Sequence, residues 1–166
     1  MNFDKNGQIS VELLLLIGIT IIIAISLSNI INTENELNKA MISAENGAYE
    51  GISINSLAIY PEETFEEYMN KSQEQLTHTK NIKIIKIDKK IQKTDKYNKT
   101  RIQLKVYASS PDINSKEDKE STGDRINYNI RKCISESFNS ENLSNALYNP
   151  SFTPHYSFTT ANVQWI

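Results

Sequence analysis

The 166-residue sequence is poor in cysteine and in excess charge. Its single cysteine, Cys133, cannot form an internal disulfide or an all-cysteine metal site. The net charge of -2 gives no electrostatic basis for nucleic-acid binding. Stability must therefore come from packing or from neighbouring subunits, and we expect no nucleic-acid partner.

Common enzyme motifs are also missing: the chain has no G-x-x-x-x-G-K, G-x-G-x-x-G, G-x-S-x-G or H-E-x-x-H. The histidines, His78 and His155, lie far apart in the sequence, which favours ordinary surface histidines over metal ligands. Cys133 falls on an apolar helical stripe, where a small buried hydrophobe is favoured over a reactive thiol. We expect no enzyme activity, no cofactor and no metal.

A long apolar run near the N-terminus is the most informative segment. Residues 13–31 read LLLLIGITIIIAISLSNII and carry no charge. A helix of this length spans about 28 Å, close to the hydrocarbon thickness of a bilayer. Hydroxyl side chains in the run can bond back to helix carbonyls, so they cost little in lipid. We therefore expect a transmembrane helix over 13–31.

A cleaved secretory signal is the weaker interpretation of this run. Such signals have an apolar region of about 7–15 residues and a small-residue cleavage site after it, and no clear site follows Ile31. Lys5 precedes the run, and the positive-inside rule then favours a cytoplasmic N-terminus with an exported C-terminal domain.

An acidic residue, Glu12, stands at the edge of the apolar run. An ionisable group at that depth is costly and tends to have a partner or a function. The alternative is a carboxylate at headgroup depth near a helix N-terminus, where the helix dipole favours it. The residue type alone leaves both interpretations open.

The residues around this glutamate form the pattern Gln8-x-Ser10-x-Glu12-x-x-x-Leu16. The pattern resembles the class III signal peptide of archaeal type IV pilins, at every fixed position, and no bacterial-style G-F-T-L-x-E is present. The resemblance implies that a prepilin peptidase cuts between Gly7 and Gln8. It also implies that the short leader is removed and that the apolar helix stays on the mature protein.

The resemblance further implies a major or minor filament subunit whose partners are other pilin subunits and membrane lipid. In related pilins a glutamate at this place pairs with the new N-terminal amine of a neighbouring subunit, so Glu12 would set the register of assembly. The exported domain would lie at the cell surface, where adhesion is one expected role. The alternative is a single-pass anchored surface binding protein that never assembles.

Beyond the run, the pattern predicts an α+β fold: a leader over 1–7, a long N-terminal helix over 8–60 and a small exported domain over 61–166. Apolar residues at helical intervals extend the first helix. They are Leu37, Met41, Ala44, Ala48 and Ile52. Gly47 and Gly51 mark a bend or a close packing contact.

In the exported domain we expect an antiparallel sheet of about three strands and one or two helices. A short helix runs from Pro61 to about Gln75. One strand contains Ile82, Ile84 and Ile87, with a bulge at Ile84–Ile85, and a second strand covers 102–106. With the polar connection 93–99 between them, the two strands are expected to form an antiparallel hairpin. The polar stretch 109–123 is expected to be a loop.

A second helix is predicted from a later apolar stripe, and the tail is expected to be a final strand over 156–166 because it is aromatic and β-prone. The stripe consists of Ile126, Ile130, Cys133, Ile134 and Phe138, with Leu143 and Leu147 as an extension ended by Pro150 and Pro154.

Two surface features carry alternatives. The hairpin lysines either deter aggregation at an exposed strand edge, which is favoured, or form a basic face for acidic residues of a neighbouring subunit. The lysines are 83, 86, 89, 90, 93, 96 and 99, and the acidic residues are Glu62, Glu63, Glu66 and Glu67. Asn70, Asn98 and Asn142 begin N-glycosylation sequons, which matter only if the domain is outside the cell.

Overall fold

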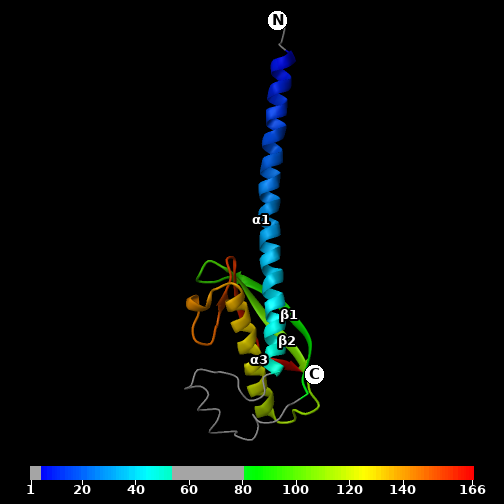
Figure 1. Cartoon of the computed structure of the whole chain (residues 1–166), viewed down its shortest axis with the longest axis vertical. Coiled ribbons are helices and arrows are strands. Elements are labelled where there is room, and N and C mark those ends of the chain that lie inside the picture. The colour runs from blue at the N-terminus through cyan, green and yellow to red at the C-terminus, as the bar shows by residue number, and fades with distance from the viewer. Residues whose placement is uncertain (1–4, 54–80) are drawn as a thin grey trace. The chain divides into compact units, whose positions relative to one another are not determined.

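The computed structural model describes residues 5–53 and 81–166, and the side chains of all of these except 5–10. The chain forms two compact units, Met1–Asn38 and Lys39–Ile166. The elements, shown in Figure 1, are α1 (Lys5–Ser53), β1 (Lys83–Thr94), β2 (Thr100–Ser109), α3 (Lys116–Ser137), η1 (Glu141–Leu143), β3 (Ser151–Phe152), β4 (Tyr156–Thr160) and β5 (Gln164–Trp165). The predicted α+β class with a long N-terminal apolar helix is confirmed.

Helix α1 runs without interruption over 49 residues. The predicted end of this helix near residue 60, and the short helix predicted from Pro61 to Gln75, lie outside the described residues. The second unit, which we call the body, therefore consists here of residues 39–53 and 81–166.

Strands β1 and β2 form the predicted antiparallel hairpin, in which Ile87 lies opposite Val106. The register shifts between Ile84 and Lys86, which places the predicted bulge at Ile85. The tail joins the sheet as predicted, but as two short strands, β4 and β5, and the sequence pattern had not indicated β3.

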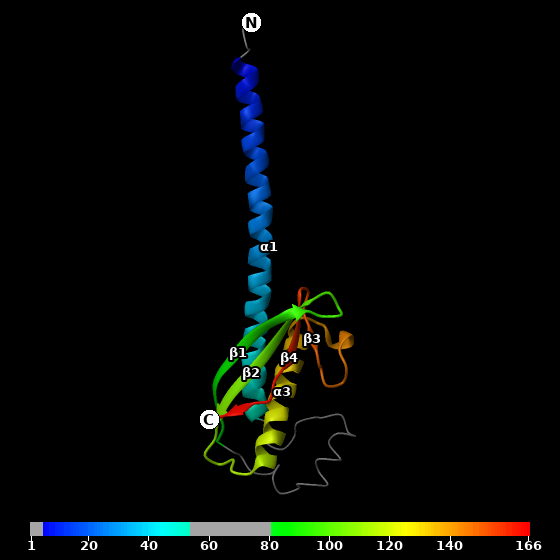
Figure 2. The same cartoon turned by 180° about the vertical axis from the view of Figure 1, so that it is seen from behind.

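The sheet is mixed and five-stranded, and not antiparallel with about three strands. Its order is β1-β2-β4-β3, with β5 also paired to β2, as Figure 2 shows from behind. Both β4 and β5 run parallel to β2, whereas β3 pairs antiparallel with β4. The connection explains the difference, because α3 lies between β2 and β4 and a helical crossover returns the chain in the same direction.

The core lies on one face of this sheet. Phe158 on β4 is paired with Ile102 on β2, and both are fully buried. The alternate residues of β2 and the predicted stripe of α3 complete it: Leu104, Val106, Ala108, Ile126, Ile130 and Ile134 all have an exposed fraction of zero. Period-two and period-3.6 patterns therefore located the buried faces correctly.

Residues 39–53 of α1 pack on α3 through small side chains. Three alanines of this segment are fully buried: Ala40, Ala44 and Ala48. A Cβ at Gly47 would lie 2.5 Å from the Asn129 carbonyl oxygen, and a Cβ at Gly51 would lie 2.8 Å from the Ile126 Cα. Of the two predicted alternatives, the glycines mark a close packing contact.

Polar contacts hold these two helical segments antiparallel. Lys39 Nζ donates to the Ser137 carbonyl at 2.7 Å, and the Ser43 and Ser137 hydroxyls are 2.7 Å apart. At the other end, Arg125 Nε donates to the Gly51 carbonyl at 2.7 Å. Each cation thus satisfies a carbonyl in the last turn of the partner helix, where intrahelical donors are missing.

The start of α3 corrects the predicted loop over 109–123, because the helix begins at Lys116. The Ser115 hydroxyl accepts the Asp118 N–H at 3.0 Å, and Glu117 and Asp118 place acid near the positive end of the helix dipole. The polar composition was misleading, whereas the S-x-x-D spacing is a helix-start signal that the sequence did contain.

The end of α3 is a second correction. The helix stops at Ser137, so Leu143 does not extend its stripe and is 69% exposed. Asn139 adopts a left-handed φ of 50°. Its N–H and that of Ser140 return to the carbonyls of Glu136 and Ser135. This is a Schellman ending, so an asparagine, and not the prolines further along, stops the helix.

Candidate processing and assembly site

The signal motif occupies the first turns of α1. The Gly7–Gln8 peptide bond lies within the helical range, three residues after its start at Lys5. The N–H groups of a first turn have no intrahelical acceptors, so this segment can unwind for a peptidase at little cost. The side chains of Gln8 and Ser10 lie outside the described ones, and the motif is therefore described through Glu12 and Leu16.

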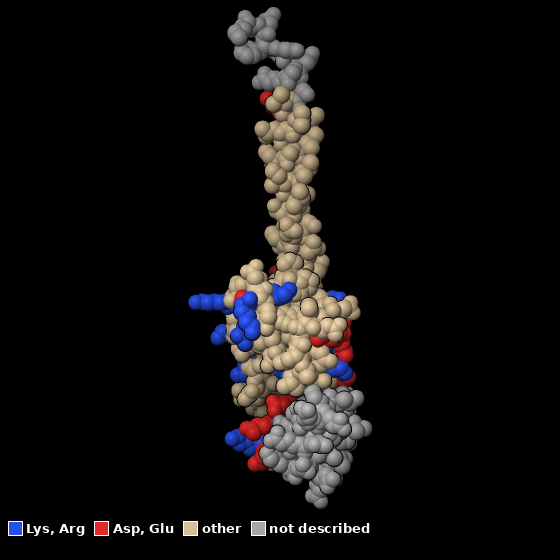
Figure 3. Space-filling model, turned by 90° about the vertical axis from the view of Figure 1, so that its left-hand side faces the viewer, with Lys and Arg blue, Asp and Glu red and all other residues tan. Residues whose placement is uncertain are grey.

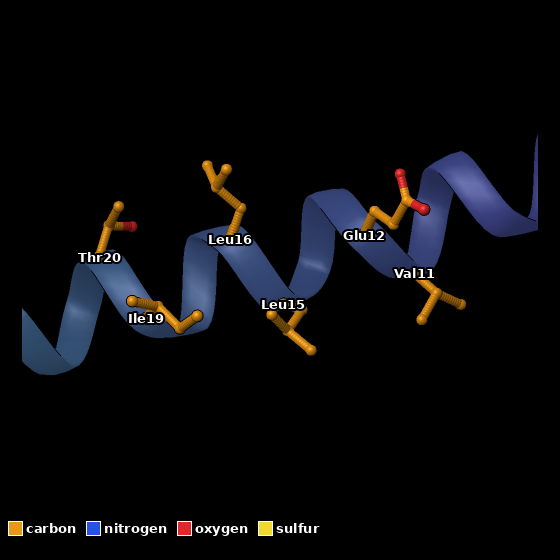
Figure 4. A pocket seen from close by; sticks show the side chains of 6 residues that line it. All are labelled: Val11, Glu12, Leu15, Leu16, Ile19 and Thr20. Carbon is orange, nitrogen blue, oxygen red and sulfur yellow. The ribbon is translucent and has the colours of Figure 1, made fainter.

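Glu12, Leu16 and Thr20 project from one side of the helix, one turn apart, as Figure 4 shows. Glu12 is exposed, and no hydrogen bond or ion pair joins its carboxylate to another residue of the described part of the chain. It is also the one charged residue within 11–31 of the sequence. Its nearest described neighbours on the helix, Val11, Leu15 and Leu16, are apolar, so none of these side chains is a partner for this charge.

The segment 13–31 presents apolar side chains on every side. Leu14, Ile22 and Ile30 are each 59–69% exposed. An 18-residue window of this helix has a mean hydropathy of 2.6, and none of that window is buried. The visible face in Figure 3 shows a long stretch without Lys, Arg, Asp or Glu. An apolar surface of this length requires cover by lipid or by other protein.

Two of the polar side chains of this segment form hydrogen bonds within the helix. Thr20 Oγ1 donates to the Ile17 carbonyl at 2.8 Å, and Ser26 Oγ donates to the Ile22 carbonyl at 2.9 Å. This confirms the predicted back-bonding. These two hydroxyls therefore add no unpaired donor to the apolar surface.

The predicted glycosylation sites fall on exposed turns where they are described. Asn98 lies in the β1–β2 turn with a φ of 59°, and Asn142 lies in η1. Both side chains are exposed, whereas Asn70 lies outside the described residues. Exposure is a condition for glycosylation, and glycosylation itself stays a prediction.

The lysine-rich hairpin fits the edge-protection alternative. Strand β1 is an outer strand of the described sheet and carries exposed lysines along it. Lys99 departs from the predicted basic face, because its Nζ donates to the carbonyls of Thr153 at 2.6 Å and Pro154 at 2.7 Å. The acidic residues of the other alternative, at positions 62, 63, 66 and 67, lie outside the described residues.

The cysteine and the histidine in the described part of the chain, Cys133 and His155, lie apart from the signal motif in the sequence. Cys133 is half-buried and its Sγ lies 3.3 Å from Glu50 Oε2. Desolvation and then the Glu50 hydrogen bond raise the pKa of the thiol to about 12, so it is a poor nucleophile. His155 is exposed in the β3–β4 turn, and His78 is not described. Over the described residues, no group of three or more His, Cys, Asp or Glu could hold a metal ion.

Comparison with known proteins bears on the same segment. Residues 5–31 match the family model of the class III signal peptide, the type found in archaeal type IV pilin-like proteins. No curated protein and no solved structure matches the chain. The match confirms the resemblance carried by residues 8–16. It indicates a pilin-like prepilin, implies processing by a prepilin peptidase, and together with the apolar helix indicates membrane anchoring.

Proposed function

We propose that the chain is the precursor of a type IV pilin-like filament subunit. It enters the membrane through residues 13–31 with its N-terminus in the cytoplasm, is cleaved between Gly7 and Gln8, and then assembles at the cell surface through α1. Its role is structural and not catalytic. The observation that carries the proposal is the exposed, uncharged apolar surface that directly follows a class III signal motif.

The same surface serves in two environments. In the bilayer the side chains of 13–31 contact lipid tails, and in a filament they contact the equivalent helices of other copies. Such helix–helix contacts are driven by close packing, because lipid is as apolar as the side chains themselves. The contact is head-to-tail in type, which allows an open filament.

Cleavage creates a charge that can meet Glu12. The new α-amine on Gln8 lies four residues before Glu12, on the same face of the helix. In a filament, the amine of one subunit can pair with the Glu12 carboxylate of the next. Breaking a buried ion pair costs about 3–5 kcal/mol, so a subunit in the wrong register is strongly disfavoured.

Processing provides the first test. N-terminal sequencing of protein extracted from membranes is expected to begin at Gln8, and the same material is expected to be recovered in filaments. An intact Met1 start without filaments would instead support the anchored surface binding protein. In that case residues 13–31 would serve as a permanent anchor only.

A matched pair of variants tests the register role. Glu12→Gln is expected to leave membrane insertion intact and to reduce filament yield at least tenfold, with cleavage scored separately by intact mass. Thr20→Val on the same helix face is the control, because the Thr20 hydroxyl is already bonded to the Ile17 carbonyl. Unchanged cleavage and filament yield in Glu12→Gln would remove the register role.

A further inference from the structure

The body carries a groove of about 580 Å³ whose lining comes from six elements of the fold. They are the β1–β2 turn, strand β2, the short helix η1, the loop that follows it, strand β3 and strand β4. The lining includes Asp95, Tyr97, Arg101, Asn149, Ser157 and Thr159. The volume lies in the range of about 300–1,000 Å³ that is typical of small-ligand sites.

The wall formed by the β1–β2 turn is held in place by Asp95. Its Oδ1 accepts the N–H of Tyr97 at 2.9 Å and that of Lys99 at 3.1 Å. Lys99 in turn is anchored to the carbonyls of Thr153 and Pro154. The backbone of this wall is therefore held in place before a ligand binds.

The opposite wall, residues 144–150, is organised in the same way. Asn145 Oδ1 accepts the N–H of Leu147 at 3.1 Å and that of Asn149 at 2.9 Å. Ser144 Oγ donates to the Pro150 carbonyl at 2.6 Å. A site that is built before binding loses little conformational entropy on binding, which favours even a small ligand.

The floor of the groove contains one hydroxyl, that of Thr159, whose hydrogen-bonding capacity the described part of the chain does not use. Ser157 and Thr159 alternate with the core residue Phe158 and so lie on the sheet face away from the core. Thr159 is 7% exposed, and its hydroxyl has no hydrogen-bond partner in the described part of the chain. A buried hydroxyl without a partner is costly, and a ligand with hydroxyl groups of its own would satisfy it.

An aromatic ring and a pair of opposite charges complete the lining. Tyr97 is 47% exposed, and Phe152 holds its ring edge-to-face at a centroid distance of 4.9 Å and an angle of 81°. Desolvation raises the pKa of Asp95, but hydrogen bonds from Ser157, Lys99 and Tyr97 and the charge of Arg101 outweigh it and hold this pKa below its usual value. The groove thus offers an ionised acceptor beside a guanidinium donor.

We propose that this groove binds an uncharged sugar residue. The apolar face of a sugar ring fits against an exposed aromatic ring, and its adjacent hydroxyls both donate and accept, which matches the Asp95 carboxylate and the Arg101 guanidinium. The inference does not rest on the proposed function, because a permanently anchored body would carry the same groove.

The sugar has two candidate sources, and the sequons point to one of them. Asn98 directly follows the groove residue Tyr97, and Asn142 directly precedes the groove residue Leu143. A glycan on either asparagine would begin at the rim. The groove therefore takes either the terminal sugar of a glycan on this protein or the sugar of an external glycan, by the same contacts.

The experiment titrates the unglycosylated full chain with the methyl glycosides of glucose, galactose, mannose and N-acetylglucosamine. The chain is made in a host without N-glycosylation and kept in a detergent whose headgroup is not a sugar. Isothermal titration is expected to give a dissociation constant of about 1 mM or tighter for at least one of the four. Absence of binding for all four overturns the proposal.

Three variants localise any binding that is found. Tyr97→Ala is expected to weaken it at least tenfold. Thr159→Val keeps the side-chain volume, removes only the unpartnered hydroxyl, and is expected to weaken binding about two- to tenfold. Tyr107→Ala is the control, because Tyr107 on β2 also has a lysine over its ring, as Tyr97 in the β1–β2 turn does, but does not line the groove. Binding that survives both groove substitutions unchanged overturns the proposal.

Glycosylated protein from the native host then separates the two sources. If the protein's own glycan occupies the groove, external glycosides no longer bind, and Asn98→Gln with Asn142→Gln restores their binding. If the ligand is external, glycosylated and unglycosylated protein bind equally. Both results support the groove as a sugar site and differ only in the source of the sugar.

Discussion

Gly18 and Gly47 lie in the same helix, yet they have opposite surroundings. A Cβ at Gly18 would meet nothing within 4 Å, whereas a Cβ at Gly47 would lie 2.5 Å from a carbonyl oxygen of α3. The first glycine belongs to a segment whose side chains face outward on all sides, and the second to a packed helix pair. One continuous helix thus has two kinds of surroundings, and within the described residues only its second half is packed against another helix.

The largest expected effect comes from placing a charge in each region at equal exposure. Ile22 is 66% exposed in the apolar segment, and Ile91 is 64% exposed on β1. Ile22→Arg is expected to make membrane insertion less favourable by about 3 kcal/mol, the cost of arginine near a bilayer centre. Ile91→Arg is expected to change the free energy of unfolding by no more than about 0.5 kcal/mol.

Membrane insertion of Ile22→Arg is measured with an assay whose readout does not depend on glycosylation. The free energy of unfolding of Ile91→Arg is measured by thermal unfolding of the body. Equal insertion of Ile22→Arg and the unchanged chain would show that residues 13–31 do not enter lipid. The apolar segment 13–31 and the body would then not differ in their tolerance of an exposed charge.

The next effect is smaller and lies in the helix pair. Gly47→Ala is expected to lower the free energy of unfolding of the body by about 2 kcal/mol, because the added methyl group overlaps the backbone of α3. Gly18→Ala is expected to leave the body's unfolding unchanged, since none of the described residues comes within 4 Å of a Cβ at that position. Thermal unfolding of both variants provides the measurement, and equal midpoints would contradict the close packing at Gly47.

The smallest effect concerns the start of α3. Ser115→Ala removes the side-chain cap and is expected to cost about 1 kcal/mol of unfolding free energy. Ser115→Asp keeps an acceptor at the same place and is expected to retain stability. Chemical denaturation provides the measurement. If both variants unfold at the same denaturant concentration as the unchanged chain, Ser115 does not cap α3, and the polar loop that begins at residue 109 extends beyond residue 115.

Local patterns predicted the elements whose residues interact along the chain. The alternation at Ile102, Leu104 and Val106 located β2, and the irregular pair Ile84–Ile85 located a bulge. The stripe at Ile126 and beyond located α3. These patterns suffice because an amphipathic element must turn its apolar side toward a core, whatever that core contains.

Such local patterns could not predict contacts between residues that lie far apart in the sequence. Alternation in the tail is the same for parallel and antiparallel pairing, so the mixed sheet could not be predicted from it. Leu147 continued a helical spacing although Asn139 had already ended the helix. The groove draws its lining from six elements of the fold, and none of them carries a motif that would single it out.

The apolar anchor segment and its processing signal could be predicted from the amino-acid sequence alone. Both depend on residues close together in the chain, namely the pattern over 8–16 and the uncharged run over 13–31. Three features became evident only from the folded chain: the parallel pairing of β4 and β5 with β2, the close contact at Gly47, and the groove beside Asn98. Those features depend on which distant surfaces meet, and that is settled by packing the whole body.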